Sequence, residues 1–356
     1  MLRSLLLSMS FPGLLSGADA ICDRLLEAKD STYGFSPASL SKLEKTAKLP
    51  GLDRFWNLAK SDPSHSAACL RAMLEKERHD PFFLFDGSQL LFSLDKSARS
   101  AEVVAEALSS VNLDDIQSYD YVELAIEVSK AGADISSAAM NFARSRNVED
   151  FTLSSGARMN REQGIVALFG RLPEDVSVAK GKALYQSGDA VASPYGLLVL
   201  ALALTPDAVA ILKQSGDITS LPAAVRRQIN ALLSPLEPPV RLPAAYKREQ
   251  LLAMLKSAPK YANGLRGPSG NEDFLGSAIT GLQAEDAPLV REARRRSLMD
   301  ASMSSMLQYY AFTHMLHVVE TRAGVFDSKP ATAPAIAAVE KPKPKPKPRS
   351  KRKARK

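Results

Sequence analysis

The stretch SAEVVAEALSSV, residues 100–111, decides the fold class. Its apolar residues follow the i, i+3, i+4, i+7 spacing that puts side chains on one face of an α-helix. They are Val104, Ala107, Leu108 and Val111. Similar rows recur at Tyr121, Leu124, Ala125 and Val128, and at Leu221, Val225, Ile229 and Leu232. Alternation typical of strands is almost absent, so we predict an all-α protein.

The breaks between these helices carry start and stop signals. Five pairs place a residue that can cap free backbone amides directly before a proline, which the first helical turn tolerates. These pairs are Ser36-Pro37, Asp62-Pro63, Asp80-Pro81, Ser193-Pro194 and Thr205-Pro206. Glycines, which adopt the left-handed conformation at low cost, stand where helices should stop. They are Gly132, Gly170, Gly188 and Gly216. Starts and stops alternate closely, which predicts a succession of short helices.

One segment, YGLLVLALAL from Tyr195 to Leu204, is apolar on every face. It is about half as long as the ~20 residues that a membrane helix needs. We therefore expect a helix that other helices surround at the centre of the fold.

Two segments share a further pattern. LPAAVRRQINALLSP (Leu221 to Pro235) and EDAPLVREARRRSLM (Glu285 to Met299) both place a proline two or three residues before Val-Arg. This pattern resembles the proline-then-Val-Arg signature of HEAT repeats, over about 30 of the 356 residues. The resemblance implies a superhelical stack of short antiparallel helix pairs, an α-solenoid. Other α-α superhelices and a compact helical bundle are the alternatives.

The segment SPLEPPVRLP, residues 234–243, carries four prolines and cannot be helical throughout. We expect it to be a seam between an N-terminal helical-repeat block, residues 21–233, and a C-terminal helical block, residues 244–326. An Ala/Pro-rich and then Lys/Pro-rich basic tail, residues 327–356, should be disordered.

The N-terminus, MLRSLLLSMSFPGLLSGADA, has the order of a secretory signal peptide. Arg3 precedes an apolar run from Leu5 to Leu15, and Ala18 and Ala20 supply the small residues of a cleavage site. We predict cleavage after Ala20 and a periplasmic or secreted protein that is not transmembrane once cleaved. The alternative is an amphipathic or irregular first segment that stays attached.

The chain has two cysteines, Cys22 and Cys69. In an oxidising compartment they can form one disulfide that ties the N-terminal segment to the helix around Cys69. They can equally be two buried thiols that behave as small apolar side chains. The sequence leaves both possibilities open.

The charge of the chain is unevenly placed. Residues 329–356 hold eleven Lys or Arg and one acid, about +10, whereas the rest has 35 basic and 38 acidic residues, or −3. A nucleic-acid-binding surface spread over the body is therefore not supported. Repeated Lys-Pro steps prevent a helix and favour an extended polyproline II arm.

Such an arm binds polyanions through charge and counterion release. The expected polyanion-binding residues are Lys341, Lys343, Lys345, Lys347, Arg349, Lys351, Arg352, Lys353, Arg355 and Lys356. For an exported protein the partners would be anionic lipid, lipopolysaccharide or a wall polymer, and nucleic acid is disfavoured. A solubilising tail without a dedicated partner is the alternative.

Catalytic signatures are absent from the sequence: it has no phosphate-binding glycine loop, no G-x-S-x-G and no H-E-x-x-H. His314 and His317 lie one helical turn apart, but a stable metal site needs further ligands, and both continue an apolar row. We expect no metal, no cofactor and no enzymatic activity.

The sequence thus favours a non-enzymatic, exported helical-repeat scaffold that binds a protein or peptide partner and is tethered by its tail. One alternative is an envelope-polymer hydrolase with an active site in a concave groove. Another is a cytoplasmic scaffold associated with nucleic acid.

Overall fold

A computed structural model describes residues 16–33, 51–76, 81–113, 118–146, 148, 150–152, 158–215, 218–233, 247–256, 281–298 and 303–326. The described chain is almost entirely helical, which confirms the all-α prediction. Its strands, β1 (Phe151–Thr152) and β2 (Arg158–Met159), form a two-residue antiparallel pair. Within the described ranges, no helix combines the length and hydropathy needed to cross a membrane. The expected seam 234–243 and tail 327–356 lie outside the described residues.

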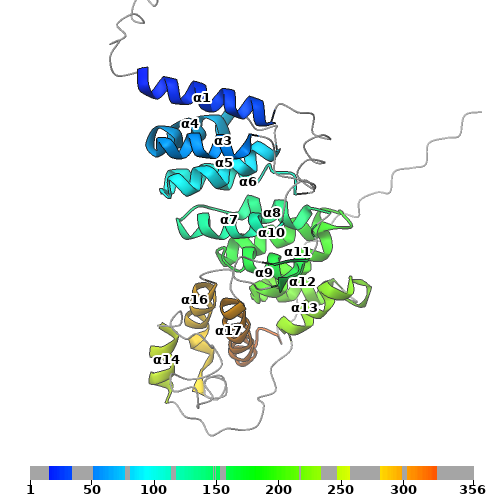
Figure 1. Ribbon diagram of the computed structural model, residues 1–356. Helices are drawn as coiled ribbons and strands as arrows, with labels where there is room; N and C mark the ends of the chain where they lie inside the picture. Colours follow the sequence, from blue (N-terminus) through cyan, green and yellow to red (C-terminus); the bar gives the residue numbers. More distant parts are fainter. Residues whose placement is uncertain are drawn as a thin grey trace, which may run out of the picture.

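The N-terminal helices follow one another down the view of Figure 1, starting with α1 in dark blue. They are α1 (Ser16–Tyr33), α3 (Leu52–Ser61), α4 (Pro63–Lys76), α5 (Pro81–Leu94) and α6 (Ala98–Leu108). Helix α1 packs on α3 and α4, α4 packs on α5, and α5 packs on α6. The first core is therefore built mainly between helices that are neighbours in the chain.

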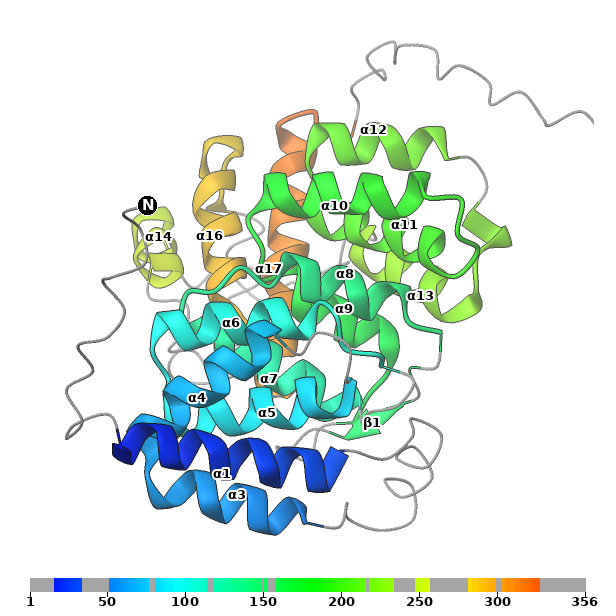
Figure 2. The same cartoon turned by 90° about the horizontal axis from the view of Figure 1, so that it is seen from above.

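The middle of the chain continues in the same way. It comprises α7 (Ser118–Lys130), α8 (Ser136–Arg144), α9 (Arg161–Phe169), α10 (Glu174–Gln186), α11 (Ala192–Ala203), α12 (Pro206–Gln214), the 3-10 turn η1 (Ile218–Ser220) and α13 (Ala223–Leu233). The C-terminal helices are α14 (Arg248–Lys256), the 3-10 turn η3 (Ala284–Asp286), α16 (Ala287–Ser297) and α17 (Met303–Arg322). Helix α16 packs against both α14 and α17 (Figure 2).

Most of the predicted helix starts are confirmed. Helices α4 and α5 begin at Pro63 and Pro81, and α12 begins at Pro206. The side chain of Thr205 caps α12 by accepting a hydrogen bond from the backbone of Ala208 at 3.2 Å. Pro194 instead lies in the first turn of α11, which begins at Ala192. The pair Ser36-Pro37 lies outside the described residues.

The predicted stops are of two physical kinds. Gly132 and Gly188 follow α7 and α10 with φ angles of 95° and 68°, the left-handed region that glycine adopts most easily. Gly170 ends α9 with an ordinary helical φ of −64°. A Cβ there would approach Leu298 Cδ1 to 2.7 Å, so close packing rather than backbone conformation requires this glycine. Gly216 is not among the described residues.

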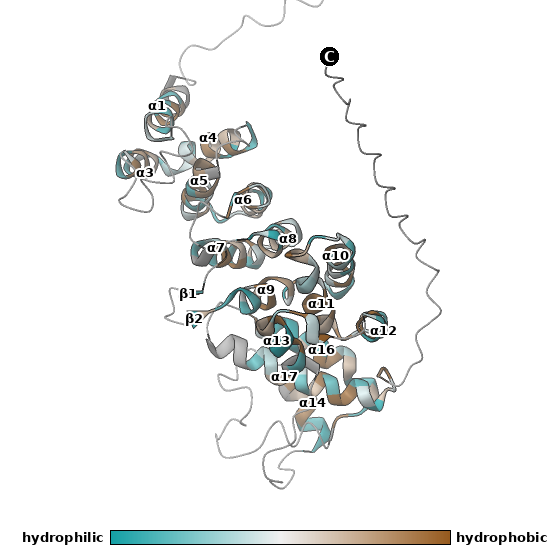
Figure 3. Cartoon of the chain, turned by 90° about the vertical axis from the view of Figure 1, so that its right-hand side faces the viewer, coloured by the Kyte–Doolittle hydropathy of each residue, from teal (hydrophilic) through white to brown (hydrophobic). Residues whose placement is uncertain are grey.

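The apolar helix α11 lies at the centre of the packing, as its sequence predicts. Every residue from Tyr195 to Leu204 is buried, and α11 contacts α8, α9, α10, α12 and α13. Its approach to α10 is close enough that a Cβ on Gly196 would lie 2.4 Å from the backbone nitrogen of Tyr185. Figure 3 shows the hydrophobic residues, in brown, where the helices meet their neighbours.

The buried apolar side chains form two clusters. The larger runs from Ile21 in α1 to Ile229 in α13 and also takes in Leu298 and Tyr309. The smaller consists of residues from α14, α16 and α17 together with Leu204 and Leu282. Leu204, at the end of α11, thus connects the C-terminal cluster to the rest of the protein.

A polar cluster fixes the connection between α5 and α6. The Asp95 carboxylate accepts hydrogen bonds from the Ser100 hydroxyl at 2.6 Å and from Ser97, and it pairs with Arg71 of α4 at 2.5 Å. These contacts, the bond from Ser100 above all, lower the pKa of Asp95 from 3.8 to about 2. Asp95 therefore stabilises the fold in its ionised form.

Candidate functional site

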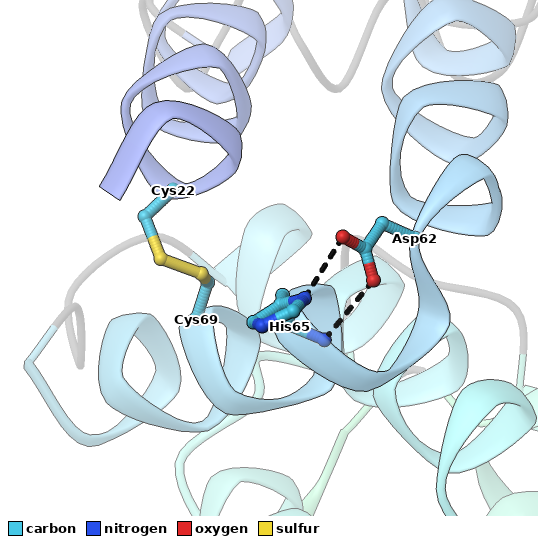
Figure 4. The surroundings of a disulfide bond; sticks show 4 residues. All are labelled: Cys22, Asp62, His65 and Cys69. Atoms are coloured by element: carbon cyan, nitrogen blue, oxygen red, sulfur yellow. Dashed lines mark hydrogen bonds and ion pairs between the residues drawn. A yellow bond between two sulfur atoms is a disulfide. The ribbon is translucent and has the colours of Figure 1, made fainter. Parts of the chain in front are cut away.

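The two cysteines are joined in a disulfide, with their Cα atoms 5.4 Å apart. Figure 4 shows the bond between Cys22 on α1 and Cys69 on α4. His65, one turn before Cys69, bonds through Nδ1 to Asp62 at 2.9 Å, and this contact lowers the pKa of Asp62. Ile21 and Leu25 are buried on the same helix as Cys22. The disulfide therefore reinforces a helix that the apolar core already holds.

The expected cleavage point, between Ala20 and Ile21, lies inside α1, which begins at Ser16. Cleavage there would shorten the helix to residues 21–33. The half-buried Cys22 and the buried Ile21, Leu25 and Ala28 would remain.

The histidine pair lies on α17. His317 is buried and stacks on Phe326 with a centroid distance of 4.4 Å, and its Nδ1 lies 3.5 Å from the Thr321 hydroxyl. The nearby carboxylate of Glu320 is engaged by Arg291 of α16. Within the described part of the chain, no three His, Cys, Asp or Glu residues come together as a metal site would require. The expected polyanion-binding residues from Lys341 to Lys356 lie outside the described residues.

The most elaborate polar arrangement lies at the C-terminal end of α11. Backbone carbonyls at a helix end lack partners within the helix and carry partial negative charge. Arg291 donates to the carbonyls of Ala203 at 2.9 Å and Leu204 at 3.0 Å, and Arg294 donates to that of Leu202 at 2.6 Å. Two arginines of another helix, α16, therefore cap the C-terminal end of α11.

This capping explains an unusual backbone conformation. Leu204 is fully buried with a φ of 50°, which costs a non-glycine residue about 1–2 kcal/mol. Its left-handed turn brings the carbonyl of Leu204 within reach of Arg291. The bonds from α16 thus offset the strain and attach the C-terminal helices to α11.

Carboxylates complete the arrangement. Glu174, in the first turn of α10, accepts from Arg291 at 2.5 Å and from Arg294 at 3.2 Å. Arg291 also pairs with Glu320, which is buried on α17. Arg294 lies over the ring of Tyr309, with 5.5 Å between its guanidinium carbon and the ring centroid. Burial raises the pKa of the Tyr309 phenol. The guanidinium groups of Arg291 and Arg294 thus link α16 to α10, α11 and α17.

A cavity of about 320 Å³ opens beside these arginines, and we call it the junction cavity. Its walls come from the end of α9, the start of α10, the end of α11, α16 and α17. The polar side chains that line it include Arg291, Arg294, Arg295, Glu174 and Glu292. The apolar part of its lining includes Phe169, Leu172, Leu202, Ala203 and Pro288.

The lining favours ion recognition over nucleophilic chemistry. The lining described here contains no histidine or cysteine, and the hydroxyl of its one serine, Ser177, donates to the backbone of Phe169 at 2.9 Å. Both lining carboxylates pair with arginines. The arrangement can therefore hold an anion, but it presents no activated nucleophile.

Sequence reasoning did not find this site. The segment EDAPLVREARRRSLM is notable for its proline and Val-Arg pair, but three of its four arginines, Arg291, Arg294 and Arg295, are the residues that line the cavity. A dense run of arginines on one short helix is the signal that could have identified it. No protein-family model, curated protein or solved structure matches the chain.

Proposed function

We propose that this protein is an exported α-helical scaffold that binds a protein or peptide partner and is held at an anionic envelope surface by its basic tail. The observation that carries the proposal is the packing order, in which helices pack mainly on their chain neighbours. This order is typical of solenoids, whose stacked helix pairs offer extended binding surfaces. The pairs α5 with α6, α10 with α11 and α16 with α17 follow it.

The two HEAT-like segments behave alike, which supports the repeat interpretation. Val225 and Val290 are both fully buried. The arginine after each one donates backwards to a carbonyl, Arg226 to Thr219 at 2.7 Å and Arg291 to Ala203 at 2.9 Å. In both segments the valine packs in the core while the arginine donates to a backbone carbonyl, in the adjacent turn η1 for Arg226 and in the distant helix α11 for Arg291.

The disulfide supports export, because such bonds persist mainly in oxidising compartments. The proposed mature protein begins at Ile21, and its Cys22–Cys69 bond then fixes the new N-terminus to α4. Mass spectrometry of the protein purified from its native host tests this step. A mature N-terminus at Ile21 is expected, whereas an intact Met1 in an otherwise functional protein would support the cytoplasmic alternative.

The tail supports surface retention because its charge of about +10 contrasts with −3 for the rest of the chain. A basic residue near an anionic surface contributes about 1 kcal/mol, and salt screens this attraction. The expected targets are anionic lipid, lipopolysaccharide or a wall polymer. Ten basic residues, from Lys341 to Lys356, would act together.

Retention on isolated native envelopes tests the tether. We compare the full chain, a chain lacking residues 341–356, and a matched chain of full length in which the ten basic residues are replaced by Gln. Both altered chains should be released at low salt, and the full chain only at high salt. Equal retention of all three proteins would rule out the tether. Proteins that co-purify with the full chain in high salt, where the tail is screened, would be candidate partners of the helical body.

A further inference from the structure

We propose that the junction cavity binds a singly charged carboxylate that carries an apolar group, as at the end of a peptide whose last side chain is apolar. The inference names the chemistry that the scaffold would recognise on its partner and rests on the proposed function to that extent. A free organic acid presents the same chemistry. The experiment below distinguishes these two sources.

The size and walls of the cavity suit such a ligand. At about 320 Å³ it falls at the small end of ligand pockets, which span about 300–1,000 Å³. Phe169, Leu172 and Leu202 provide an apolar wall, and the guanidinium groups of α16 provide a charged one. A ligand with one apolar end and one anionic end would match both walls.

The three lining arginines differ in the donors that they have left. A guanidinium group has five N–H donors. Arg291 makes five hydrogen bonds, to Glu174, Ala203, Leu204 and twice to Glu320, so it positions the wall without binding a ligand. Arg294 makes two such bonds with the described residues, to Leu202 and Glu174.

Arg295 is the residue best placed to bind. Its two hydrogen bonds, both 3.0 Å long, go to Glu292 on the same helix, and 51% of its side chain is exposed. Such an exposed pair is weak and is easily exchanged for a ligand. Arginine recognises carboxylates through two parallel hydrogen bonds, which gives geometric specificity as well as charge.

The net charge of the cavity wall favours a ligand with a single negative charge. The ion pairs at this wall join four arginines, Arg291, Arg294, Arg295 and Arg296, to three glutamates, Glu174, Glu292 and Glu320, which leaves one positive charge in excess. A carboxylate neutralises this excess. A doubly charged phosphate would exceed it and face the carboxylates of Glu174 and Glu292 across a small space. We therefore expect carboxylates to bind more tightly than phosphate.

Ligand-observed NMR titration of the purified full chain tests the proposal with four probes. They are the peptide acetyl-Ala-Ala-Phe with a free carboxylate, the same peptide as its amide, phenylacetate, and inorganic phosphate. The free-acid peptide or phenylacetate should bind at least tenfold more tightly than the amide and than phosphate. Tighter binding of the peptide points to a chain end as the natural ligand, and tighter binding of phenylacetate points to a free acid. Equal binding of the acid and the amide, or no binding of either acid at millimolar concentration, would overturn the proposal.

Variants locate the binding. Arg295→Gln should weaken binding of the tighter-binding acid probe at least tenfold. Glu292→Gln should strengthen that binding several-fold, because it releases Arg295 and removes a negative charge. Arg227→Gln, a matched change at an exposed arginine on α13 that does not line the cavity, should leave the affinity unchanged. Circular dichroism melting confirms that each variant is folded. Unchanged binding by folded Arg295→Gln protein would refute the site. Since the assay uses purified protein and small probes, a failure of envelope retention does not affect its outcome.

Discussion

Removing the disulfide should destabilise the protein by a predictable amount. Cys22 and Cys69 are 47 residues apart in the chain, and closing a loop of that length in the unfolded chain corresponds to about 4 kcal/mol in the chain-entropy treatment. Replacing both residues by alanine removes this restraint without placing a hydroxyl beside the buried Cys69. We therefore expect the unfolding free energy to fall by about 2–4 kcal/mol.

Helix α1 should nevertheless stay folded onto α3 and α4. Ile21, Leu25 and Ala28 are buried, and each large apolar side chain contributes roughly 1.5–3 kcal/mol by burial. The Cys22→Ala/Cys69→Ala protein should therefore keep the helical content of the parent protein. Its free energy of unfolding should depend somewhat more steeply on denaturant concentration, because an unfolded chain without the crosslink is more expanded and exposes more surface.

Urea denaturation followed by circular dichroism measures this effect, with and without a phosphine reductant. The reductant should destabilise the parent protein by a similar amount and have no effect on the double variant, which serves as the control. A loss below about 1 kcal/mol in both the reduced parent and the double variant would refute the reasoning. A reductant effect that persists in the double variant would show that it does not act through this bond.

Three further changes probe the packing and the charges. Gly196→Ala should cost about 1–3 kcal/mol in urea denaturation, because its Cβ would lie 2.4 Å from the Tyr185 nitrogen; stability equal to that of the parent would contradict this close packing. The hydrogen bond from Ser100 is the main reason that the pKa of Asp95 is about 2 instead of the ordinary 3.8, so ionised Asp95 stabilises the fold above pH 4 and this stabilisation is lost as the pH falls toward 2. Asp95→Asn should therefore remove about 1 kcal/mol of the loss of stability in acid. Parallel curves of stability against pH for the variant and the parent would argue against this role of Asp95. Arg291→Ala should lower the free energy of unfolding by about 3–5 kcal/mol in calorimetry, because it leaves the buried carboxylate of Glu320 unpaired. Arg295→Gln should change it by under about 0.5 kcal/mol. Equal effects of the two changes would contradict a structural role for Arg291 that Arg295 does not share.

Local periodicity and capping residues were sufficient for much of the fold. The start of α12 at Pro206 and the ends of α7 and α10 near Gly132 and Gly188 follow from the conformations that proline and glycine allow. The burial of Tyr195–Leu204 follows from a segment with no polar face. Gly170 was placed correctly at a helix end, but its reason is contact with Leu298, which belongs to a distant part of the chain.

The candidate site could not be predicted in the same way. Arg291 and Arg294 lie about 90 residues from the carbonyls of α11 that they cap, and about 120 from Glu174. No local pattern specifies which arginine meets which carboxylate at such separations. The pairing of Cys22 with Cys69 was open for the same reason, since it depends on a distance between two helices.

The sequence by itself thus determined the helical class, many helix boundaries, the central apolar helix and the separation of a basic tail from a slightly acidic body. These properties depend on backbone conformation, side-chain spacing and charge along the chain. The tertiary structure alone decided that α16 caps the buried end of α11, that Arg291 is fully engaged and Arg295 is not, and that a cavity lies beside them. Those outcomes depend on how helices far apart in the chain meet. The groups that packing brings next to a charged side chain decide whether it is paired or remains available to a ligand.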